Sequence, residues 1–349
     1  MTSALVTGVT GQDGSYLSEY LLGRNYEVYG LVRRTSTQHP WRIKHLLSHD
    51  GFELIEGDLS DQSSLNRAIE QSEPDEVYNL AAQSFVGTSF DQPAHTGDIT
   101  GLGAVRVLEA VRDKAPSARF YQASSSEMFG EVQEMPQNED TPFYPRSPYG
   151  IAKLYAHWAT INYREAHDIH AVCGILFNHE STRRGKEFVT RKIARGAAAI
   201  AADNQNELRL GNLDAKRDWG HARDYVRAMH AMLQQPKDQA REYVVGTGRI
   251  HTVRKCAEIA FDEVGLDYED YVVVDENFHR PAEVHTIQAD PTRAKADLDW
   301  EPRTTFEDLI REMTRTEQER IERNDEFWTK PDTGLLNSET EMEPSYDDA

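Results

Sequence analysis

The stretch ALVTGVTGQDGSYLSEYLL, residues 4–22, puts three glycines between an apolar strand-like run and a helix-like run. Gly8, Gly11 and Gly14 follow the spacing G-x-x-G-x-x-G. Glycine suits such a junction because it allows a tight turn and lets a pyrophosphate approach the N–H groups at a helix N-terminus. A glycine-rich turn without a ligand is the alternative. The position at the first strand–helix junction favours the phosphate-binding interpretation.

Short apolar runs and helix-like stretches alternate through the first half of the chain. Strands are expected at Ala4–Thr7, Glu27–Val32, Phe52–Glu56, Glu76–Leu80, Arg119–Ala123, Ala171–Phe177 and Glu242–Val245. Helices are expected at Ser15–Arg24, Ser63–Gln71, Gly101–Asp113, Tyr149–His167 and Asp218–Leu233. Such alternation calls for a parallel sheet with helices on both faces. The expected fold class is therefore α/β, a doubly wound parallel sheet of Rossmann type with a smaller mixed α/β C-terminal substrate domain.

The expected domain boundaries follow the change in pattern after the sixth strand. Residues 1–177 together with 213–248 form the expected Rossmann domain, and residues 178–212 together with 249–330 form the expected second domain. The last stretch, 331–349, is acidic and poor in apolar residues, so we expect it to be mobile.

The chain is strongly acidic. Its 349 residues include 59 Asp and Glu against 38 Lys and Arg, which gives a formal net charge of −21. A surface of this sign repels nucleic acids and anionic membranes, so neither is an expected partner. An acidic excess with scarce lysine also keeps proteins hydrated in a high-salt cytoplasm, and we expect a halophilic protein. The alternative is an ordinary acidic enzyme with an acidic tail.

Three absences favour a cytoplasmic protein. No window approaches about 18 uncharged apolar residues, as a membrane span would require. The first residues, MTSALVTG, enter a strand-like run without a basic region followed by an apolar stretch, so no secretory signal is expected. The two cysteines, Cys173 and Cys256, cannot form a disulfide framework or a zinc site, and no metal is expected.

The end of the second expected strand, LVRRTS, indicates which dinucleotide would bind. An NAD site usually has Asp or Glu there for the ribose 2′-hydroxyl, whereas Arg33 and Arg34 suit a 2′-phosphate and therefore NADP. A pair of solvated surface arginines is the alternative. Asp58, in EGDLSD after the third strand, could accept a hydrogen bond from the adenine amino group. The small side chains of Ala81 and Ala82, after the fourth strand, let the chain pass close to a flat ligand.

Tyr149 and Lys153 form the pattern Y-x-x-x-K at the start of an expected helix. Residues at i and i+4 share one helix face, so the ammonium can lie near the phenol. A nearby cation lowers the pKa of a tyrosine, which is ordinarily about 10, and a lowering by about three units requires about 4 kcal/mol. Such a phenolate could take a proton from a hydroxyl while hydride leaves the same carbon. Chance occurrence of the pattern is the alternative.

Ser124, Ser125, Ser126 and Glu127 follow the fifth expected strand, in QASSSEMFG. The carboxyl ends of strands face the ligand crevice in a doubly wound fold, so these side chains should point toward a substrate. A simple alcohol dehydrogenase needs serine, tyrosine and lysine but no carboxylate. Glu127 could remove the proton next to a newly formed carbonyl, which is elimination chemistry. A strand-end cap or an ion pair is the alternative role for Glu127.

Taken together, these residues resemble the extended short-chain dehydrogenase/reductase superfamily and, within it, the GDP-mannose 4,6-dehydratase family. The likeness runs from residue 4 to about 312, and its most discriminating motifs include TPFYPRSPY and GILFNHES. It is also carried by GVTGQDGSYL, GDLSD, PDEVYNLAAQS, NYRE, FVTRKI, RDWGHARDYV and RPAEV. The resemblance implies a lyase that converts GDP-D-mannose to GDP-4-dehydro-6-deoxy-D-mannose and water.

The resemblance also implies roles for four catalytic residues, Ser125, Glu127, Tyr149 and Lys153. Tyr149 would deprotonate the mannose 4-hydroxyl while the C4 hydride passes to NADP⁺. Glu127 would then remove the C5 proton, water would leave from C6, and hydride would return to C6. Ser125, which stands where the family usually has threonine, would hydrogen-bond the sugar 4-oxygen. Lys153 would bind the nicotinamide ribose and support Tyr149.

The residue patterns and the resemblance together predict two binding sets. The set expected to bind NADP is Gly8, Thr10, Gly11, Gln12, Asp13, Gly14, Arg33, Arg34, Asp58, Leu59, Leu80, Ala82, Ser84, Lys153, His179 and Arg184. The set expected to bind GDP-mannose is Asn178, Val189, Lys192, Gly211, Asn212, Arg217, Arg280 and Glu283. Lysine and arginine suit a diphosphate, and the carboxylate of Glu283 suits a ribose or base donor. The family often forms tetramers, so a homodimer or homotetramer is implied.

Three other interpretations stay open at this point. A dehydratase acting on another nucleotide sugar would use the same chemistry, although TDP- and UDP-linked relatives usually have an Asp-Glu pair where this chain has Ser126 and Glu127. A 4-reductase or epimerase would need Tyr149 and Lys153 but has no use for a base at Glu127. A non-catalytic NADP-sensing regulator would generally lack the catalytic tyrosine.

Overall fold

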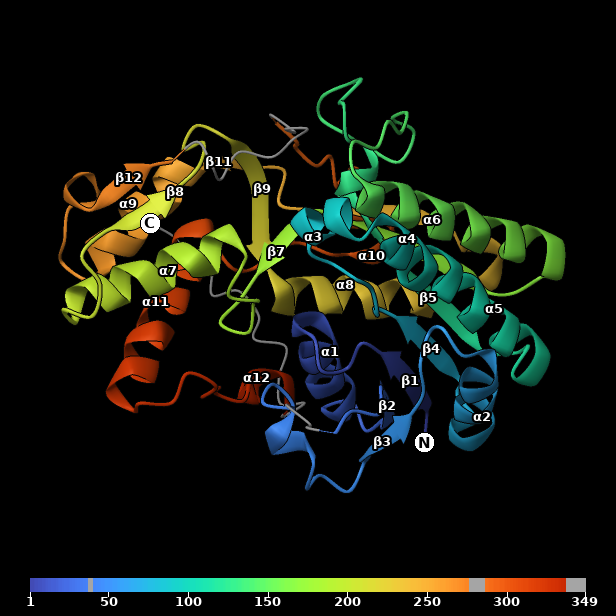
Figure 1. The fold of residues 1–349 in the computed structure, drawn as a ribbon. Helices are drawn as coiled ribbons and strands as arrows, with labels where there is room; N and C mark the ends of the chain where they lie inside the picture. Colours follow the sequence, from blue (N-terminus) through green and yellow to red (C-terminus); the bar gives the residue numbers. More distant parts are fainter. Residues whose placement is uncertain (37–39, 276–285, 337–349) are drawn as a thin grey trace, which may run out of the picture.

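A seven-stranded parallel sheet forms the centre of the described part of the chain (Figure 1). The computed structural model describes residues 1–36, 40–275 and 286–336. The strands are β1 (Ser3–Thr7), β2 (Glu27–Val32), β3 (Phe52–Glu56), β4 (Glu76–Asn79), β5 (Arg119–Ser125), β6 (Ala171–Leu176) and β10 (Glu242–Val245). They lie in the order β10-β6-β5-β4-β1-β2-β3, and all neighbours are parallel. This confirms the predicted doubly wound sheet, whose order reverses between β1 and β4 and leaves a ligand crevice there.

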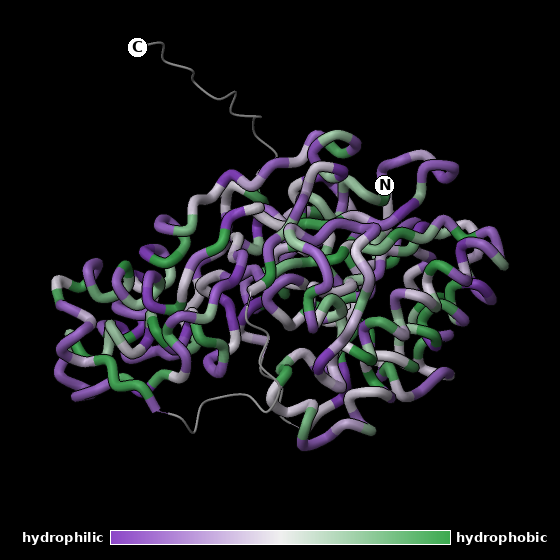
Figure 2. Tube along the Cα trace, turned by 90° about the horizontal axis from the view of Figure 1, so that it is seen from above, coloured by the Kyte–Doolittle hydropathy of each residue, from purple (hydrophilic) through white to green (hydrophobic). Residues whose placement is uncertain are grey.

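Helices cover both faces of this sheet because successive strand residues point to opposite sides. In β1, Ala4 and Val6 join the core shared with α1 (Gln12–Leu22), α8 (Ala222–Gln234) and α10 (Thr292–Leu298). Leu5 joins the core on the other face, which is covered by α2 (Gln62–Ser72), α5 (Gly103–Lys114) and α6 (Pro148–His167). Hydrophobic and hydrophilic positions alternate along the outer helices, so each of these helices buries one side (Figure 2).

A second group of elements lies beside the sheet and has its own apolar core (Figure 1). Its helices α7 (Val189–Ala201), α9 (Val253–Glu263) and α11 (Phe306–Glu322) meet around Ile193, Phe261 and Ile310. Two small sheets, β11-β9-β7 and β12-β8, are built from Ile250–Thr252, Lys216–His221, Asn178–Glu180, Val272–Val274 and Leu208–Leu210, respectively. The predicted division into two domains stays a prediction. Strand β9 lies in a small sheet of the second group, although it comes from the stretch 213–248 that we expected in the Rossmann domain.

Two helices begin later than the sequence predicts. The helix expected from Asp218 begins only at Ala222, because Asp218 lies in β9 and its carboxylate accepts three backbone N–H groups from distant loops. The helix expected from Gly101 begins at Gly103. It is preceded by α3 (Val86–Asp91), α4 (Pro93–Thr96) and the π-helix η2 (Gly97–Leu102). The short 3-10 helices are η1 (Lys44–Leu46), η3 (Ser126–Met128), η4 (Lys237–Gln239) and η5 (Tyr268–Asp270). In the described ranges, no helix combines the length and apolar character needed to cross a membrane.

The structure describes the first six residues of the stretch 331–349, whose mobility stays a prediction. A short helix, α12 (Thr333–Leu336), places Leu335 and Leu336 against the apolar core that contains α1. Partial burial of these two leucines favours the packing of this short helix on α1. The rest of the predicted tail, 337–349, lies outside the described residues.

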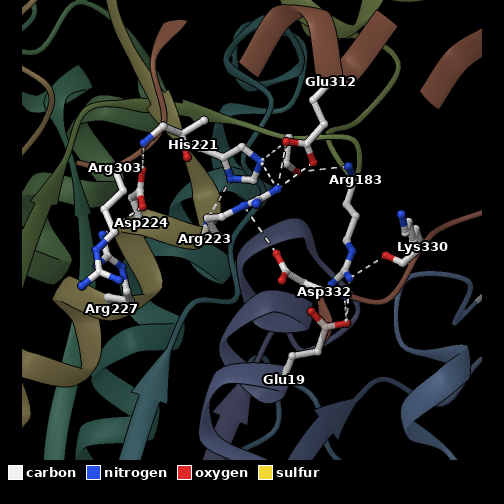
Figure 3. Close-up of polar contacts among 12 residues, drawn as sticks. Glu19, Arg183, His221, Arg223, Asp224, Arg227, Arg303, Glu312, Lys330 and Asp332 are labelled. Atoms are coloured by element: carbon white, nitrogen blue, oxygen red, sulfur yellow. Dashed lines mark hydrogen bonds and ion pairs between the residues drawn. The ribbon is translucent and has the colours of Figure 1, made fainter. Parts of the chain in front are cut away.

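A buried network of charged side chains fastens this C-terminal segment to α1 (Figure 3). The guanidinium of Arg183, in the loop after β7, donates to Glu19 Oε1 of α1 at 2.7 Å and to the Lys330 carbonyl oxygen at 3.2 Å. Both Arg183 and Glu19 have no exposed surface. Asp332 continues the network: its N–H donates to Glu19 Oε1 at 3.3 Å, and its Oδ2 lies 3.4 Å from Nε of Arg223 in α8. Arg223 in turn pairs with Glu312 of α11 at 2.7 Å. The network therefore joins α1, the loop after β7 and the second group of elements.

Candidate functional site

A cavity of about 470 Å³ opens at the carboxyl ends of β1, β4, β5 and β6. It brings together most residues of the predicted cofactor set: Gly8, Thr10, Gly11, Gln12, Asp13, Gly14, Arg33, Asp58, Leu59, Leu80, Ala82, Ser84, Lys153, His179 and Arg184. Arg34 is the member of that set that does not line the cavity. The predicted catalytic residues line the same cavity: Ser125, Glu127, Tyr149 and Lys153. Residues far apart in the chain thus share one space at the crevice that the sheet topology provides.

The glycine turn lies at the N-terminus of α1. Gly8 has a φ of +72°, in the left-handed region, and a Cβ at this position would lie 2.9 Å from the Ala81 nitrogen. A Cβ on Gly14 would lie 2.4 Å from the Gly8 carbonyl oxygen. Both positions therefore require glycine. Gly11 is the N-cap of α1 and has no side chain to cap the first N–H groups, so these groups suit a phosphate. The residues present fit the pyrophosphate of a dinucleotide.

A row of buried polar side chains fixes the strand ends beside the glycine turn. Thr7 Oγ1 donates to Asn79 Oδ1 at 2.8 Å, and Asn79 Nδ2 donates to Gln122 Oε1 at 2.8 Å. The row therefore crosses from β1 through β4 to β5. Thr7 Oγ1 also accepts the backbone N–H groups of Leu80 and Ala81, at 3.1 Å each. These bonds hold the chain after β4 close to the turn.

Asp13, in the first turn of α1, forms a close pair with His179 of β7. Asp13 Oδ2 lies 2.9 Å from His179 Nε2, and His179 Nδ1 lies 2.7 Å from the Phe177 carbonyl oxygen. Both ring nitrogens therefore face groups that only accept hydrogen bonds, so the imidazole is protonated. Burial of the ring works against this charge, but attraction to Asp13 outweighs it and raises the pKa of His179. Burial likewise opposes the ionised carboxyl, but His179 lowers the pKa of Asp13 to about 2.

Neighbouring side chains hold this pair in place. Gln12 Nε2 donates to the His179 carbonyl oxygen at 3.1 Å, and Ser181 Oγ donates to Gln12 Oε1 at 2.8 Å. The His179 ring stacks on Tyr225 with ring centroids 4.4 Å apart. Because Gln12 and Asp13 follow the glycine turn directly, these bonds join the floor of the cavity to its β7 wall.

The ends of β2 and β3 form the other end of the cavity. Arg33 lines it and is exposed, whereas Arg34 is exposed and does not line it. Asp58 Oδ1 accepts the Ser60 N–H at 2.8 Å and the Ser60 hydroxyl at 2.7 Å. Burial opposes the ionised form of Asp58, but these two bonds and the charge of Arg33 together lower its pKa. One oxygen of Asp58 takes both contacts, so the second oxygen can face a ligand.

Tyr149 lies in the first turn of α6, buried beside Ser125 and Glu127. Burial of the phenol raises the pKa of Tyr149 to about 12, helped by the Glu127 carboxylate and opposed by a hydrogen bond with Ser125. Glu127 lies in η3, and its backbone N–H donates to Ser125 Oγ at 3.2 Å. The three side chains thus come from the end of β5 and the start of α6, which the sheet topology makes neighbours.

The sequence predicts a lowered pKa for Tyr149 beside Lys153, whereas the pKa of Tyr149 is raised in the protein alone. The Lys153 ammonium lies 5.8 Å from the centre of the Tyr149 ring and donates to the Ala123 carbonyl oxygen at 2.7 Å. Burial lowers the pKa of Lys153 to about 8, against the attraction of Asp13. The prediction fails for the protein alone because burial of the phenol outweighs a cation that is held by a backbone carbonyl.

The sequence does not single out several residues at the site. His157 follows Lys153 by one turn, and its Nδ1 lies 2.9 Å from Ser124 Oγ. Burial lowers the pKa of His157 to about 4, so this ring is neutral. The i+4 spacing from Lys153 is a signal that could have identified it. Phe85 and Phe188 line the cavity, which His157 does not, but no local pattern marks either phenylalanine.

Among the described residues of the predicted substrate set, Asn178 lines the cavity. The others lie in α7, in the loop between β8 and β9, or in β9 itself: Val189, Lys192, Gly211, Asn212 and Arg217. These elements belong to the second group beside the cavity, and the substrate role of their residues stays a prediction. Arg280 and Glu283 lie outside the described residues. Over the ranges that the structure describes, no group of three or more His, Cys, Asp or Glu is placed to hold a metal ion.

Comparison with known proteins gives one family over nearly the whole chain. The family model described as GDP-mannose 4,6 dehydratase matches residues 5–313. The human protein named GDP-mannose 4,6 dehydratase is 49% identical over 346 residues, which cover 92% of this chain and 92% of that protein. The Vibrio cholerae protein named GDP-mannose 4,6-dehydratase is 47% identical over 353 residues, which cover 91% of this chain and 94% of that protein.

A solved structure extends the likeness to the fold and the coenzyme. The structure of RMD from Pseudomonas aeruginosa, complexed with NADPH, is 25% identical and superimposes with a TM-score of 0.76. The match covers 92% of this chain and 98% of that chain. A nicotinamide dinucleotide is therefore the supported class of cofactor.

Proposed function

The chain belongs to the GDP-mannose 4,6-dehydratase family. On that premise we propose that the protein first oxidises and then reduces one sugar bound in its cavity. GDP-D-mannose loses water and becomes GDP-4-dehydro-6-deoxy-D-mannose. The observation that carries the proposal is the position of Glu127 beside Tyr149 and Ser125, in one cavity with the glycine turn. An enzyme that only oxidises or reduces an alcohol needs the tyrosine and the serine but has no task for the carboxylate.

We infer that the coenzyme is NADP. The uncapped N-terminus of α1 suits the pyrophosphate, and the guanidinium of Arg33 at the rim of the cavity suits a 2′-phosphate. Asp58 suits the adenine amino group, and Lys153 lies where it can donate to the nicotinamide ribose. When bound, the nicotinamide ring supplies the hydride acceptor for C4 and the hydride donor for C6. Each cycle thus returns the coenzyme to its oxidised form.

The side chains of this cavity move the protons. Tyr149 takes the proton of the 4-hydroxyl as C4 loses its hydride, and Ser125 hydrogen-bonds the oxygen that becomes the carbonyl. The new carbonyl makes the C5 proton acidic, and Glu127 takes that proton. The C6 hydroxyl then leaves with a proton as water, and C6 receives the hydride while C5 regains a proton. No net electrons are gained or lost, and one water is released for each sugar.

The second group of elements is the proposed place for the GDP part of the substrate. Lys192 and Arg217 offer the positive charge that a diphosphate requires, on a chain whose net charge is −21. Their helix α7 and strand β9 flank the cavity residues Phe188 and Asn178. This arrangement would place the sugar at the cavity and the nucleotide beside it.

A homodimer or homotetramer is the proposed assembly, in the cytoplasm. Three large apolar side chains repeat along one face of α6, where Ile151, Tyr155 and Trp158 are 58%, 52% and 56% exposed. Apolar surface of this kind commonly lies at a subunit interface. Light scattering that gives the mass of a single chain would contradict the proposed assembly.

Incubation of the protein with GDP-mannose and NADP⁺ tests the proposed function. Mass spectrometry should find a product lighter by one water that carries a keto group, and absorbance at the reduced-nicotinamide band should show no net reduction. In the Glu127→Gln variant, water loss should stop while coenzyme affinity is kept, because the amide cannot take the C5 proton. Full turnover by Glu127→Gln, or stoichiometric consumption of coenzyme by the unaltered protein, would contradict the proposal.

A further inference from the structure

Two phenylalanines from opposite sides of the cavity meet at its lining. Phe85 follows β4 and is the N-cap of α3, whereas Phe188 is the N-cap of α7. In Figure 1, α3 lies with the parallel sheet and α7 with the second group of elements. The two rings are edge to face, with centroids 5.5 Å apart and planes at 81°. Both residues line the cavity that holds Tyr149 and Glu127.

The Phe85 ring is held in its position by its neighbours. A Cβ on Gly87 would lie 2.9 Å from the ring, so the absence of a side chain at Gly87 makes room for it. Gln83 Nε2 donates to the Phe85 carbonyl oxygen at 3.1 Å, and the Gln83 N–H donates to Thr100 Oγ1 of η2 at 3.1 Å. The loop that carries Phe85 is thus tied to η2.

The Phe188 ring is held from its own side. The guanidinium of Arg184 lies 3.6 Å from the centre of the Phe188 ring, close enough for a cation–π interaction. Arg184 in turn pairs with Glu180 of β7 at 3.0 Å. Arg184 belongs to the predicted cofactor set, so the ring is coupled to the coenzyme end of the cavity.

Neither ring serves the apolar cores of the fold. The apolar clusters among the described residues include neither Phe85 nor Phe188, and both rings are only partly buried. The two partly exposed rings touch each other, and polar catalytic groups line the same cavity. When a ligand lies beneath the rings, both lose contact with water. Their placement therefore serves what the cavity binds.

We propose that Phe85 and Phe188 form an aromatic clasp that keeps the half-reacted sugar in the cavity until hydride has returned to C6. The inference rests on the proposed function and names its positioning residues. Between the two hydride transfers the sugar has lost one hydride from C4 and one proton from the 4-hydroxyl; the bound coenzyme would hold the hydride, and Tyr149 takes the proton. A sugar that escapes then leaves as the 4-keto compound, with or without the loss of water, and leaves one reduced coenzyme behind. The clasp prevents that loss by covering the carbon–hydrogen edge of the hexose.

The ratio of reduced coenzyme to finished product measures how well the clasp retains the half-reacted sugar. Phe85→Ala and Phe188→Ala should each raise this ratio about tenfold over the unaltered protein, because an aromatic contact of this kind is removed. The double variant should resemble either single variant, since the two rings act as one unit. Absorbance of reduced nicotinamide and mass spectrometry of the released sugars give both quantities in one reaction.

Matched variants separate the clasp from a general loss of packing. Phe90→Ala, on the same helix α3 but outside the cavity lining, should leave the ratio unchanged. Phe85→Leu and Phe188→Leu keep apolar bulk and should restore most of the retention, with thermal midpoints recorded for every variant. If an alanine variant does not fold, the leucine variant at the same position replaces it in the test. Its ratio of reduced coenzyme to finished product should then be at least twofold higher than that of the unaltered protein.

The outcomes are distinguishable. A ratio that stays unchanged in the clasp variants, whatever happens to the rate, overturns the clasp, and so does an equal rise in Phe90→Ala. Failure of the unaltered protein to make the keto product would instead refute the proposed function. A clasp variant that binds NADP with the affinity of the unaltered protein but accumulates reduced coenzyme supports the inference.

Discussion

The Asp13–His179 pair should contribute about 2 kcal/mol to the stability of the folded chain. Burial opposes the ionised carboxyl, yet attraction to His179 and hydrogen bonds from His179 and Gln12 lower the pKa of Asp13 from 3.8 to about 2. One pKa unit corresponds to about 1.4 kcal/mol. The Asp13 side chain is 25% exposed, so solvent screens the pair only in part. The interaction is therefore worth about 2 kcal/mol when both groups are charged.

The sign of the pH dependence differs for the two partners. The pKa of Asp13 is lowered, so its contribution is present above the ordinary carboxyl value of 3.8 and is lost as the pH falls toward 2. The pKa of His179 is raised, so its contribution is complete below the ordinary imidazole value of 6.5 and is lost as the pH rises through the folded value. Burial and the charge of Arg184 oppose the protonated ring, whereas Asp13 and the Phe177 carbonyl favour it. The pair should stabilise most between about pH 4 and pH 6.5.

A double-mutant cycle at about pH 6 measures this interaction. Urea unfolding of the unaltered protein, Asp13→Asn, His179→Gln and the double variant gives four free energies of unfolding, without coenzyme so that binding adds nothing. The double variant should be less destabilised than the sum of the single variants by about 2 kcal/mol. The same cycle at a pH above the raised pKa of His179 should give a smaller coupling. A coupling below about 0.5 kcal/mol at pH 6, or the same coupling at both pH values, would refute the reasoning.

Three other perturbations test separate parts of the structure. Replacing Arg33 and Arg34 by glutamine should weaken NADP binding at least about tenfold more than NAD binding, measured by titration calorimetry; a parallel loss for both would remove the 2′-phosphate argument. The Arg183→Met variant should lose about 3–5 kcal/mol in urea unfolding, because the buried carboxylate of Glu19 loses its guanidinium partner, and Arg183→Lys should recover part of it. A loss below about 1 kcal/mol would contradict a structural role for the network in Figure 3. Transfer from molar KCl to dilute buffer should lower the thermal midpoint if the acidic surface is an adaptation to salt, and full activity in dilute buffer would count against it.

Most of the parallel sheet could be predicted from the sequence because its strands are continuous apolar runs between helix-like stretches. The strands β7, β8 and β12 have three residues each, and their pairing depends on contacts with distant parts of the chain. Asp218 shows the difficulty. It begins a stretch with helical periodicity, but its carboxylate is used by backbone groups of residues 247, 248 and 289, which only the folded chain brings near. Local propensity gives way there to tertiary contacts.

The residues of the candidate site divide in the same way, into local sequence patterns and contacts that only the folded chain makes. The glycine turn and the Tyr149–Lys153 pair are local patterns, so their positions could be predicted. Phe85 and Phe188 are adjacent only because the loop after β4 and the start of α7 converge, and neither has a sequence pattern of its own. The protonation of His179 likewise depends on the Asp13 carboxylate, which the topology brings from another element. A list of residue types predicts which groups are present but not which charge states they have.

Burial has opposite effects on Tyr149 and Lys153, and this links proton transfer to coenzyme binding. The phenol has a pKa of about 12, so a base near neutral pH requires a lowering by about five units, or about 7 kcal/mol. The Lys153 ammonium does not bring this about in the protein alone, because burial lowers its own pKa to about 8 and it donates to the Ala123 carbonyl oxygen. Because the value of about 12 already includes the Ser125 hydrogen bond, the lowering has to come from positive charge brought into the cavity, which an oxidised nicotinamide has and a reduced one lacks. Tyr149 would thus be a strong base only while the coenzyme can still accept hydride, and a weak one during the interval in which the aromatic clasp has to retain the sugar.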